Sequence, residues 1–301
     1  MKKVLVTGGA GFTGTALIRK LLRKYKDIEI VSVDNYSSGK KSNHVRSKRV
    51  TYLYKDTRDL VAKKFDLNNT KMDIADSLEP EVVFHFGEFS RIVTSFDKFD
   101  VCWDYNINGT QRVLDYCVTK KAKLIYSASS SKFGNDGKDE NLSPYAWMKA
   151  KMVELIKNYS VWFGLKYEIT YFYNAYGPGQ VRTGDYATVI GIFEEQYEKG
   201  EPLTVVSPGT QTRDFTHIND IVRGVILAAE KGRQDEYPLG TATSHKIIDV
   251  AKMFGDNYTM ISERRGERFY GKAIPSLTYE HLGWVASIKL EDYIANIVAK
   301  K

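Results

Sequence analysis

The sequence has few of the residues that disulfide-linked, metal-binding or membrane-spanning proteins require. Cys102 and Cys117 are its only cysteines, so we expect neither a disulfide framework nor a cysteine-rich zinc site. The five histidines are scattered without HExxH spacing, and we expect no metal. No apolar run approaches the roughly 18 residues of a membrane-spanning helix, and the apolar stretch after Met1 is too short for a signal peptide. These absences predict a cytoplasmic protein with no membrane attachment.

The composition is that of a globular protein with a large core. Hydrophobic residues make up 43% of the chain, aromatic residues 13% and charged residues 27%, which excludes a disordered protein. Lysine and arginine outnumber aspartate and glutamate by 44 to 37, a net charge of +7, which is compatible with a nucleic-acid partner or an anionic small substrate. The basic stretch at residues 40–49 carries no zinc-finger, helix-turn-helix or RNA-recognition pattern. We therefore interpret it as a solvated loop and expect no nucleic acid as partner.

Extended and helical patterns alternate along the first half of the chain. Strands are predicted at residues 3–7, 28–33, 50–54, 82–86, 123–127 and 168–173, and helices at 15–25, 103–120 and 143–163. This alternation predicts an α/β fold with a Rossmann-type doubly wound parallel sheet. Because glycine and proline interrupt the second half more often, we divide the chain into a domain at 1–173 and a smaller C-terminal α/β domain at 174–301. Some segments of the second domain are expected to return to the first.

The segment between the first predicted strand and the first helix is rich in glycine. Residues 7–14 read TGGAGFTG, with Gly8, Gly11 and Gly14 in GxxGxxG spacing. Backbone N–H groups of such a turn can approach a pyrophosphate at the positive end of the helix. Asp34 closes the second strand twenty residues after Gly14, where its carboxylate would bind the ribose hydroxyls of NAD and repel the 2′-phosphate of NADP. The alternatives are a tight turn that recruits glycine for its own geometry, and an aspartate that only begins a turn before Asn35.

A second pattern combines a tyrosine and a lysine on one predicted helix. Tyr145 and Lys149 lie four residues apart, and the preceding Ser143 and Pro144 are typical of a helix start. This spacing puts the phenol and the ammonium on one helical face. The nearby cation and the helix N-terminus are expected to lower the pKa of Tyr145, so that it can act as a base near neutral pH. YxxxK spacing is also common on ordinary amphipathic helices.

Hydroxyl-bearing residues follow the strand predicted at 123–127. Residues 127–134 read SASSSKFG, and the carboxyl end of a parallel strand is where such sheets bind ligands. Taken by itself, this stretch is more typical of a serine-rich turn. The three patterns in this order, each on the appropriate element, are much harder to obtain by chance than any one of them.

These segments resemble the extended short-chain dehydrogenase/reductases, specifically the NAD-dependent nucleotide-sugar epimerases and dehydratases. The resemblance covers essentially the whole chain and extends to residues 56–59 (DTRD), 106–110 (NINGT), 173–178 (YNAYGP), 211–217 (QTRDFTH) and 282–284 (LGW). It implies NAD as cofactor, an NAD-binding domain at 1–173 and a nucleotide-sugar-binding domain at 174–301. It also implies a homodimer through a bundle of the helices at 103–120 and 143–163, unless their apolar faces only cover the sheet.

The resemblance implies roles for individual residues. Ser129 would bind the sugar oxygen, Tyr145 would be the acid and base, and Lys149 would bind the nicotinamide ribose and tune Tyr145. The residues expected to contact NAD are Gly8, Gly11, Phe12, Thr13, Gly14, Asp34, Asn35, Ser37, Ser38, Gly39, Asp56, Thr57, Phe86, Gly87, Glu88, Ser90, Asn106, Tyr145, Lys149 and Tyr173. Those expected to contact the nucleotide sugar are Arg91, Ser129, Ser130, Tyr145, Asn174, Val189, Val205, Arg213, Arg264, Glu267 and Gly271, with Asn174, Arg213 and Arg264 at the diphosphate.

The residues after the catalytic serine favour one reaction of the family over others. Its dehydratases and decarboxylases usually carry an acidic residue directly after the catalytic serine or threonine, whereas Ser130 and Ser131 follow Ser129 here. Elimination of water needs a second acid/base, so we expect an isomerase: C4 epimerisation of a UDP-hexose or UDP-N-acetylhexosamine through a transient 4-keto sugar. The alternatives are a nucleotide-sugar 4,6-dehydratase, another oxidoreductase of the family, and a non-catalytic NAD(P)-binding sensor.

Three positions bear on the choice of sugar. Where the family usually reads HLAA, this chain has Glu88 followed by Arg91, which we interpret either as a mutual salt bridge or as substrate contacts. Gly271 falls where the family uses side-chain size to admit or exclude an N-acetyl group. A glycine there would tolerate an N-acetylhexosamine, unless it only permits a turn.

Overall fold

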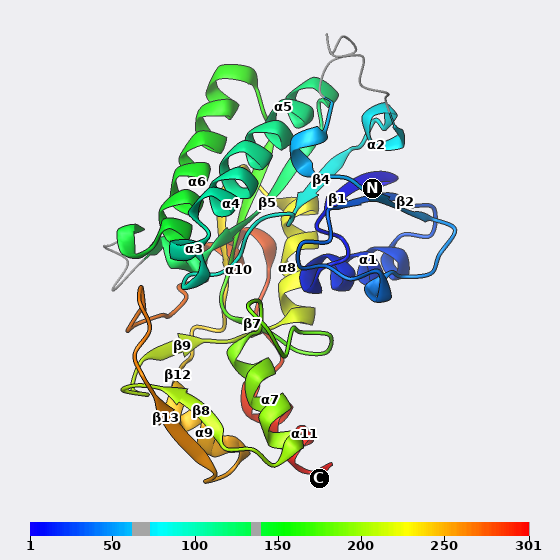
Figure 1. The fold of residues 1–301 in the computed structure, drawn as a ribbon. Helices are drawn as coiled ribbons and strands as arrows, with labels where there is room; N and C mark the ends of the chain where they lie inside the picture. Colours follow the sequence, from blue (N-terminus) through cyan, green and yellow to red (C-terminus); the bar gives the residue numbers. More distant parts are fainter. Residues whose placement is uncertain (62–72, 134–139, 301) are drawn as a thin grey trace.

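Seven parallel strands form the centre of the molecule (Figure 1). The computed structural model describes residues 1–61, 73–133 and 140–300; Gly134, the last residue of the predicted serine-rich segment, lies outside them. The strands run in the order β11-β6-β5-β4-β1-β2-β3, and every neighbouring pair is parallel. Their bounds are β1 Lys3–Thr7, β2 Glu29–Asp34, β3 Val50–Tyr54, β4 Val82–His85, β5 Lys123–Ser129, β6 Tyr167–Phe172 and β11 Glu236–Leu239. The predicted Rossmann-type α/β fold is confirmed.

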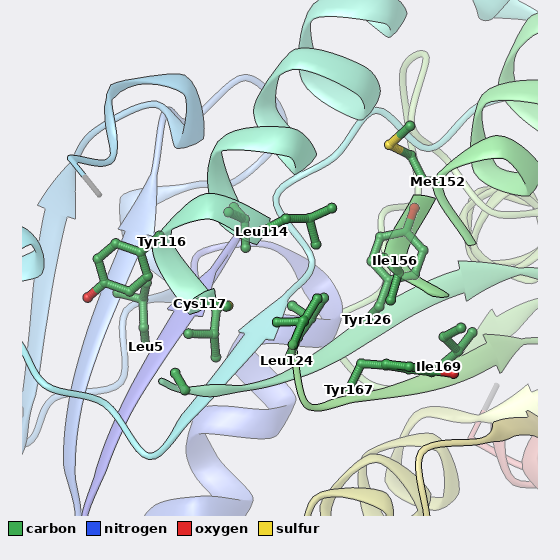
Figure 2. Packing of buried hydrophobic residues seen from close by; sticks show 14 of the residues in the cluster. Leu5, Leu114, Tyr116, Cys117, Leu124, Tyr126, Met152, Ile156, Tyr167 and Ile169 are labelled. Carbon is green, nitrogen blue, oxygen red and sulfur yellow. The ribbon is translucent and has the colours of Figure 1, made fainter. Parts of the chain in front are cut away.

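Helices cover both faces of this sheet, as crossover connections between parallel strands require. One face carries α5 (Thr110–Lys120) and α6 (Pro144–Phe163), and the other carries α1 (Phe12–Lys24) and α8 (Ile218–Lys231), with α10 (Ser276–Leu282) beside α8. Two apolar cores result, one on each side of the sheet. Figure 2 shows the first, where Leu114 and Cys117 of α5 lie over Leu5 and Leu124 of the strands.

The start of α6 follows from its local sequence. Ser143 is the N-cap, and its hydroxyl accepts a hydrogen bond from the backbone N–H of Ala146, while Pro144 occupies the first helical position. The helix ends at Gly164, whose φ of 69° continues the chain in the left-handed conformation. Tyr145 is thereby fixed in the first turn, as the sequence predicts.

The single helix predicted at 103–120 is wrong. The structure has α4 (Phe99–Trp103), a π-helical segment (Asp104–Gly109) and then α5. The wider turn coincides with Asn106, which is fully buried and hydrogen-bonds both the backbone N–H and the carbonyl of Phe89. A tertiary contact to the loop after β4 therefore occupies the place where a regular helix was expected.

The remaining elements form a smaller part beneath the sheet, with segments that return to it. Its strands are β8 (Leu203–Val206) paired with β13 (Tyr258–Ile261), β9 (Thr212–Asp214) with β12 (Ser244–Lys246), and β7 (Ala175–Tyr176) with β10 (Thr216–His217). Its helices α7 (Val189–Lys199), α9 (Ile247–Phe254) and α11 (Leu290–Val298) share a third apolar core. Strand β11 and helix α8, although late in the chain, belong to the central sheet layer (Figure 1).

Short elements complete the described chain: α2 (Ile74–Ser77), α3 (Thr94–Asp97) and 3₁₀ turns at Lys41–Asn43, Thr57–Asp59, Ser130–Phe133 and Glu140–Leu142. A cleft of about 650 Å³ opens at the carboxyl ends of the central strands and is lined from above by the loops after β1, β4 and β5 and from below by the smaller part. Within the described ranges, no helix has the length and apolar character to cross a membrane.

Candidate active site

The glycine-rich turn after β1 packs its backbone too closely for side chains. A Cβ on Gly8, whose φ is +70°, would lie 2.8 Å from the backbone nitrogen of Gly87, and one on Gly14 would lie 2.2 Å from the carbonyl oxygen of Gly8. Gly11 is the N-cap residue of α1, and no side chain caps the first N–H groups of this helix. The first turn of α1 thus presents bare backbone N–H groups to the cleft, which is the arrangement a pyrophosphate requires.

Asp34 at the end of β2 forms the second part of this half of the cleft. Its carboxylate accepts hydrogen bonds from the backbone N–H groups of Ala10 and Tyr36, at 2.9 and 2.8 Å. Burial raises the pKa of Asp34, and these two backbone bonds partly offset that rise. The carboxylate and the glycine turn line one hollow with Asn35, Ser37, Ser38 and Thr57. A cradle without side chains beside a fixed carboxylate fits the pyrophosphate and the adenosine ribose of NAD.

The three predicted catalytic residues meet at the centre of the cleft. Ser129 ends β5, Tyr145 lies in the first turn of α6, and Lys149 follows one turn later. The Ser129 hydroxyl hydrogen-bonds the phenolic oxygen of Tyr145 and itself accepts a bond of 2.8 Å from the Ser131 hydroxyl. Serine and tyrosine hydroxyls are therefore held together at one point, where they can bind a single substrate oxygen.

The expectation that Lys149 lowers the pKa of Tyr145 is wrong. Burial raises the pKa of Tyr145 to about 12, although the hydrogen bond from Ser129 and the charge of Arg91 act in the opposite direction. The charge of Glu88 adds to the rise. Desolvation of a buried phenolate outweighs the favourable charges around it.

Glu88 forms an ion pair with Lys149. Its carboxylate pairs with the Lys149 ammonium, with both side chains almost fully buried, and accepts hydrogen bonds from the hydroxyls of Tyr126 (2.9 Å) and Thr110 (3.1 Å). Lys149 also donates to the carbonyl of Ser127 at 2.7 Å. Burial lowers the pKa of Lys149, and Glu88 opposes that effect. Of the two interpretations of Glu88 and Arg91, the mutual salt bridge is therefore wrong.

A hydrogen-bonded chain anchors Glu88 to the first strand. The Thr7 hydroxyl accepts from the backbone N–H groups of Phe86 and Gly87, so its own proton is free to go to Nδ1 of His85, 2.6 Å away. Nε2 of His85 then donates to the Thr110 hydroxyl, which donates to Glu88. This assignment makes His85 neutral, in agreement with burial lowering its pKa to about 4.

Arg91 lines the cleft beside Tyr145 without a carboxylate partner in the described part of the chain. Its guanidinium donates to the backbone carbonyls of Ser90 (2.8 Å) and Tyr186. Its Nε is buried and has no hydrogen-bond partner. A cleft-lining guanidinium with an unsatisfied buried donor is compatible with the predicted substrate contact.

The lower half of the cleft carries three further arginines, Arg213, Arg264 and Arg268. Arg213 forms an ion pair with Glu267, and burial lowers the pKa of Arg213. Arg268, which the sequence analysis missed, is buried yet lines the cleft and donates to the Ser130 carbonyl at 2.5 Å and more weakly to its hydroxyl. Asn174 uses its side-chain amide to bind the carbonyl of Asp214 at 2.7 Å. The sequence feature that could have identified Arg268 as a site residue is its position directly after Glu267 in a basic segment.

Most of the predicted site residues line the cleft or the hollow beside Asp34. They are Gly8, Gly11, Phe12, Thr13, Gly14, Asp34, Asn35, Ser37, Ser38, Thr57, Phe86, Gly87, Glu88, Ser90, Arg91, Ser129, Ser130, Tyr145, Lys149, Asn174, Val189, Arg213, Arg264 and Glu267. Gly39 packs against the Asp34 carboxylate, and Asp56 binds Asn35 and Arg58. Neither lines the cleft itself.

Four other predicted residues do not line the cleft. Val205 is fully buried in the third core, because along β8 its neighbours Thr204 and Val206 face the cleft instead. Asn106 and Tyr173 are buried behind the lining. Gly271 is not among the lining residues, and a Cβ there would lie 2.7 Å from Nη2 of Arg268, which does line the cleft. Within the described residues, no cluster of potential metal ligands occurs.

Comparison with known proteins places these features in a family. The sequence model of the NAD-dependent epimerase/dehydratase family matches residues 4–240. A putative UDP-glucose 4-epimerase of Methanocaldococcus jannaschii is 28% identical over 98% of this chain and 97% of its own. A UDP-N-acetyl-alpha-D-glucosaminuronate decarboxylase of Bacillus cytotoxicus is 28% identical over 83% of this chain and 78% of its own. The Thermotoga maritima UDP-glucose 4-epimerase, solved with UDP-glucose, superimposes with a TM-score of 0.88 at 25% identity, covering 99% and 97% of the two chains.

Proposed function

The chain belongs to the NAD-dependent epimerase/dehydratase family, and we propose that it is an epimerase that inverts C4 of a UDP-linked hexose or N-acetylhexosamine. The observation that carries this proposal is the meeting of Ser129, Tyr145 and Lys149 in a cleft where no free carboxylate among the described residues faces them. Epimerisation needs one group that takes up and returns a proton, whereas elimination needs a second.

The carboxylates that line the cleft within the described part of the chain support this choice. They are Asp34, Glu88, Asp185 and Glu267. Asp34 accepts two backbone N–H bonds, while Glu88, Asp185 and Glu267 pair with Lys149, Lys98 and Arg213. A carboxylate engaged in this way is poorly placed to act as the second acid/base of a dehydratase.

NAD is the cofactor of the family, and the upper cleft fits it. The N–H groups at the start of α1 would hold its pyrophosphate and Asp34 its adenosine ribose. Lys149 would hold the nicotinamide ribose. When bound, NAD supplies a hydride acceptor that returns the hydride, and its positive charge favours the Tyr145 phenolate.

The protein's own residues orient the sugar and handle its proton. Ser129 and Tyr145 would bind the oxygen at C4 of the sugar, with Tyr145 taking its proton and later returning it. Arg91 and Ser129 stabilise the Tyr145 phenolate. Arg213 and Arg264 would bind the diphosphate of the nucleotide. Inversion then requires only that the cleft let the sugar present its other face.

The experiment is a product analysis by NMR. The protein is incubated with NAD and with UDP-, dTDP- and GDP-linked sugars, and coupling constants at C4 are read in the products. The proposal expects a C4 epimer and its loss in Tyr145→Phe, which keeps the ring but not the hydroxyl. A 4-keto-6-deoxy sugar or released CO₂ would instead identify a dehydratase or a decarboxylase.

We further propose that the protein is a homodimer formed through the predicted helices at 103–120 and 143–163, which in the structure run from the end of α4 through the π-helical segment and α5, and along α6. The sheet-facing side of α6 is buried, but Val161, Trp162 and Phe163 at its end are exposed, as are Phe99 and Trp103 of α4. Apolar side chains of this size are seldom left exposed together unless they meet a partner. Light scattering should give twice the monomer mass at micromolar concentration, and Trp162→Glu should give the monomer.

A further inference from the structure

Arg268 occupies the space that Gly271 leaves beside the cleft. A Cβ on Gly271 would come within 2.7 Å of Nη2 of Arg268. The Arg268 guanidinium is held at the carbonyl and hydroxyl of Ser130. The space beside Gly271, where the sequence analysis expected room for an N-acetyl group, is therefore filled by a guanidinium.

Arg268 has no carboxylate partner in the described ranges. The two carboxylates whose charges act on the pKa of Arg268 are already engaged: Glu267 pairs with Arg213, and Asp214 accepts from the backbone N–H groups of residues 241, 242 and 273. Burial and the charge of Arg213 lower the pKa of Arg268 to about 10, so it remains charged at neutral pH. A buried cation without a counter-ion is costly unless a ligand supplies the negative charge.

Arg268 lies in the part of the cleft where the sugar, rather than the nucleotide, is expected to bind. Ser130, to which it is bonded, directly follows Ser129, whose hydroxyl is hydrogen-bonded to the proposed acid/base Tyr145. Three lining cations lack a carboxylate partner in the described chain: Arg91, Arg264 and Arg268. Of these, Arg264 is assigned with Arg213 to the diphosphate, and Arg91 stabilises the Tyr145 phenolate. This leaves the Arg268 guanidinium for another anion.

We propose that the sugar of the substrate carries a carboxylate and that Arg268 binds it. The inference rests on the C4 epimerisation proposed above and specifies a nucleotide-linked acidic sugar as its substrate, of which hexuronic acids are the simplest. A guanidinium matches a carboxylate with two parallel hydrogen bonds, which gives geometric selection as well as charge. A neutral hexose in the same place would leave Arg268 buried and unpaired.

The test measures binding by calorimetry on the NAD-loaded protein. UDP, dTDP and GDP are titrated first. The nucleotide that binds is then titrated in two sugar-linked forms, one with a hexuronic acid and one with the matching hexose, such as UDP-glucuronic acid and UDP-glucose. The wild type should prefer the acid by at least about tenfold, as expected for a hydrogen bond to a charged group. Arg268→Gln should reduce the ratio of the two affinities to near one, mainly by weakening the binding of the acidic sugar.

Two controls make the result specific. Arg265→Gln removes the same charge from the same segment, but Arg265 is exposed, stacks on Phe96 and does not line the cleft, so the ratio should stay as in the wild type. Arg268→Lys keeps the positive charge but cannot form two parallel hydrogen bonds to a carboxylate, and it should retain part of the preference for the acidic sugar. A wild type that does not prefer the acid overturns the inference even if Arg268→Gln fails to fold, and so does a preference that survives Arg268→Gln. Failure of all three nucleotides to bind would instead overturn the proposed function.

Discussion

Replacing Glu88 by glutamine removes the charge that balances Lys149 and changes almost nothing else. The glutamine has the same shape and can still bond the hydroxyls of Tyr126 and Thr110. Lys149 is left with the carbonyl of Ser127, 2.7 Å away, and the ring of Tyr126, whose centroid is 4.7 Å from its ammonium. The variant therefore contains a buried ammonium with no negative partner.

The cost follows from the burial of the pair. Both side chains are less than 5% exposed, at 4% for Lys149 and 2% for Glu88, and removing one partner of a buried ion pair costs about 3–5 kcal/mol. For a chain of this length, 1 kcal/mol shifts Tm by roughly 2 °C, so we expect Tm to fall by about 6–10 °C at pH 7. The loss should be smaller at pH 10, because Lys149, whose pKa burial already lowers, can then lose its proton.

The assay is thermal unfolding followed by circular dichroism, with Glu154→Gln as the matched control. Glu154 lies on the same helix as Lys149 and pairs with Lys151, but its side chain is 55% exposed, so its loss should cost less than about 1 kcal/mol. A second readout is the pH profile: because Glu88 raises the pKa of Tyr145, the rise of kcat/KM with pH should move to lower pH in Glu88→Gln. Equal Tm values for both variants, together with an unmoved pH profile, would refute the reasoning.

Three further outcomes are expected. Asp34→Ala should weaken the binding of NAD and reduce the protein's preference for NAD over NADP, because the carboxylate beside the glycine turn is lost. Equal affinities of the wild type for NAD and NADP, measured by fluorescence titration, would contradict this. Tyr145→Phe should bind NAD normally but turn over no substrate, and near-normal turnover would place the chemistry elsewhere. His85 has a pKa of about 4 in the fold against 6.5 when exposed, so the unfolded chain takes up its proton first as the pH falls, and stability is lost between these values. Urea unfolding should therefore show a loss of about 2 kcal/mol from pH 7.5 to pH 5 that His85→Gln abolishes, whereas an unchanged pH dependence in the variant would contradict it.

The fold could be read from the sequence wherever a pattern is local. The apolar residues of β1 run directly into the glycine turn, and β1 and β3 have the predicted bounds. Ser143 and Pro144 mark the start of α6 because both act through the helix's own first turn. Asn106 shows the limit: its amide binds the loop after β4 seventeen residues earlier, and no helical periodicity records that contact.

The site divides in the same way. The spacing of Tyr145 and Lys149 places both on one face of α6, but the sequence does not show that Glu88, 61 residues earlier, absorbs the lysine's charge. Arg268 escaped notice for the same reason, since its partner Ser130 is 138 residues away. Long-range pairs decide the electrostatics of this cleft, and only the folded chain brings them together.

The reaction itself is tested most directly by running it in D₂O and following the products by NMR and mass spectrometry. The account predicts a C4 epimer with no deuterium on carbon, because the only proton exchanged with Tyr145 is that of a hydroxyl group, while the hydrogen on C4 never enters the solvent. A product that gains carbon-bound deuterium, loses water or releases CO₂ would contradict it.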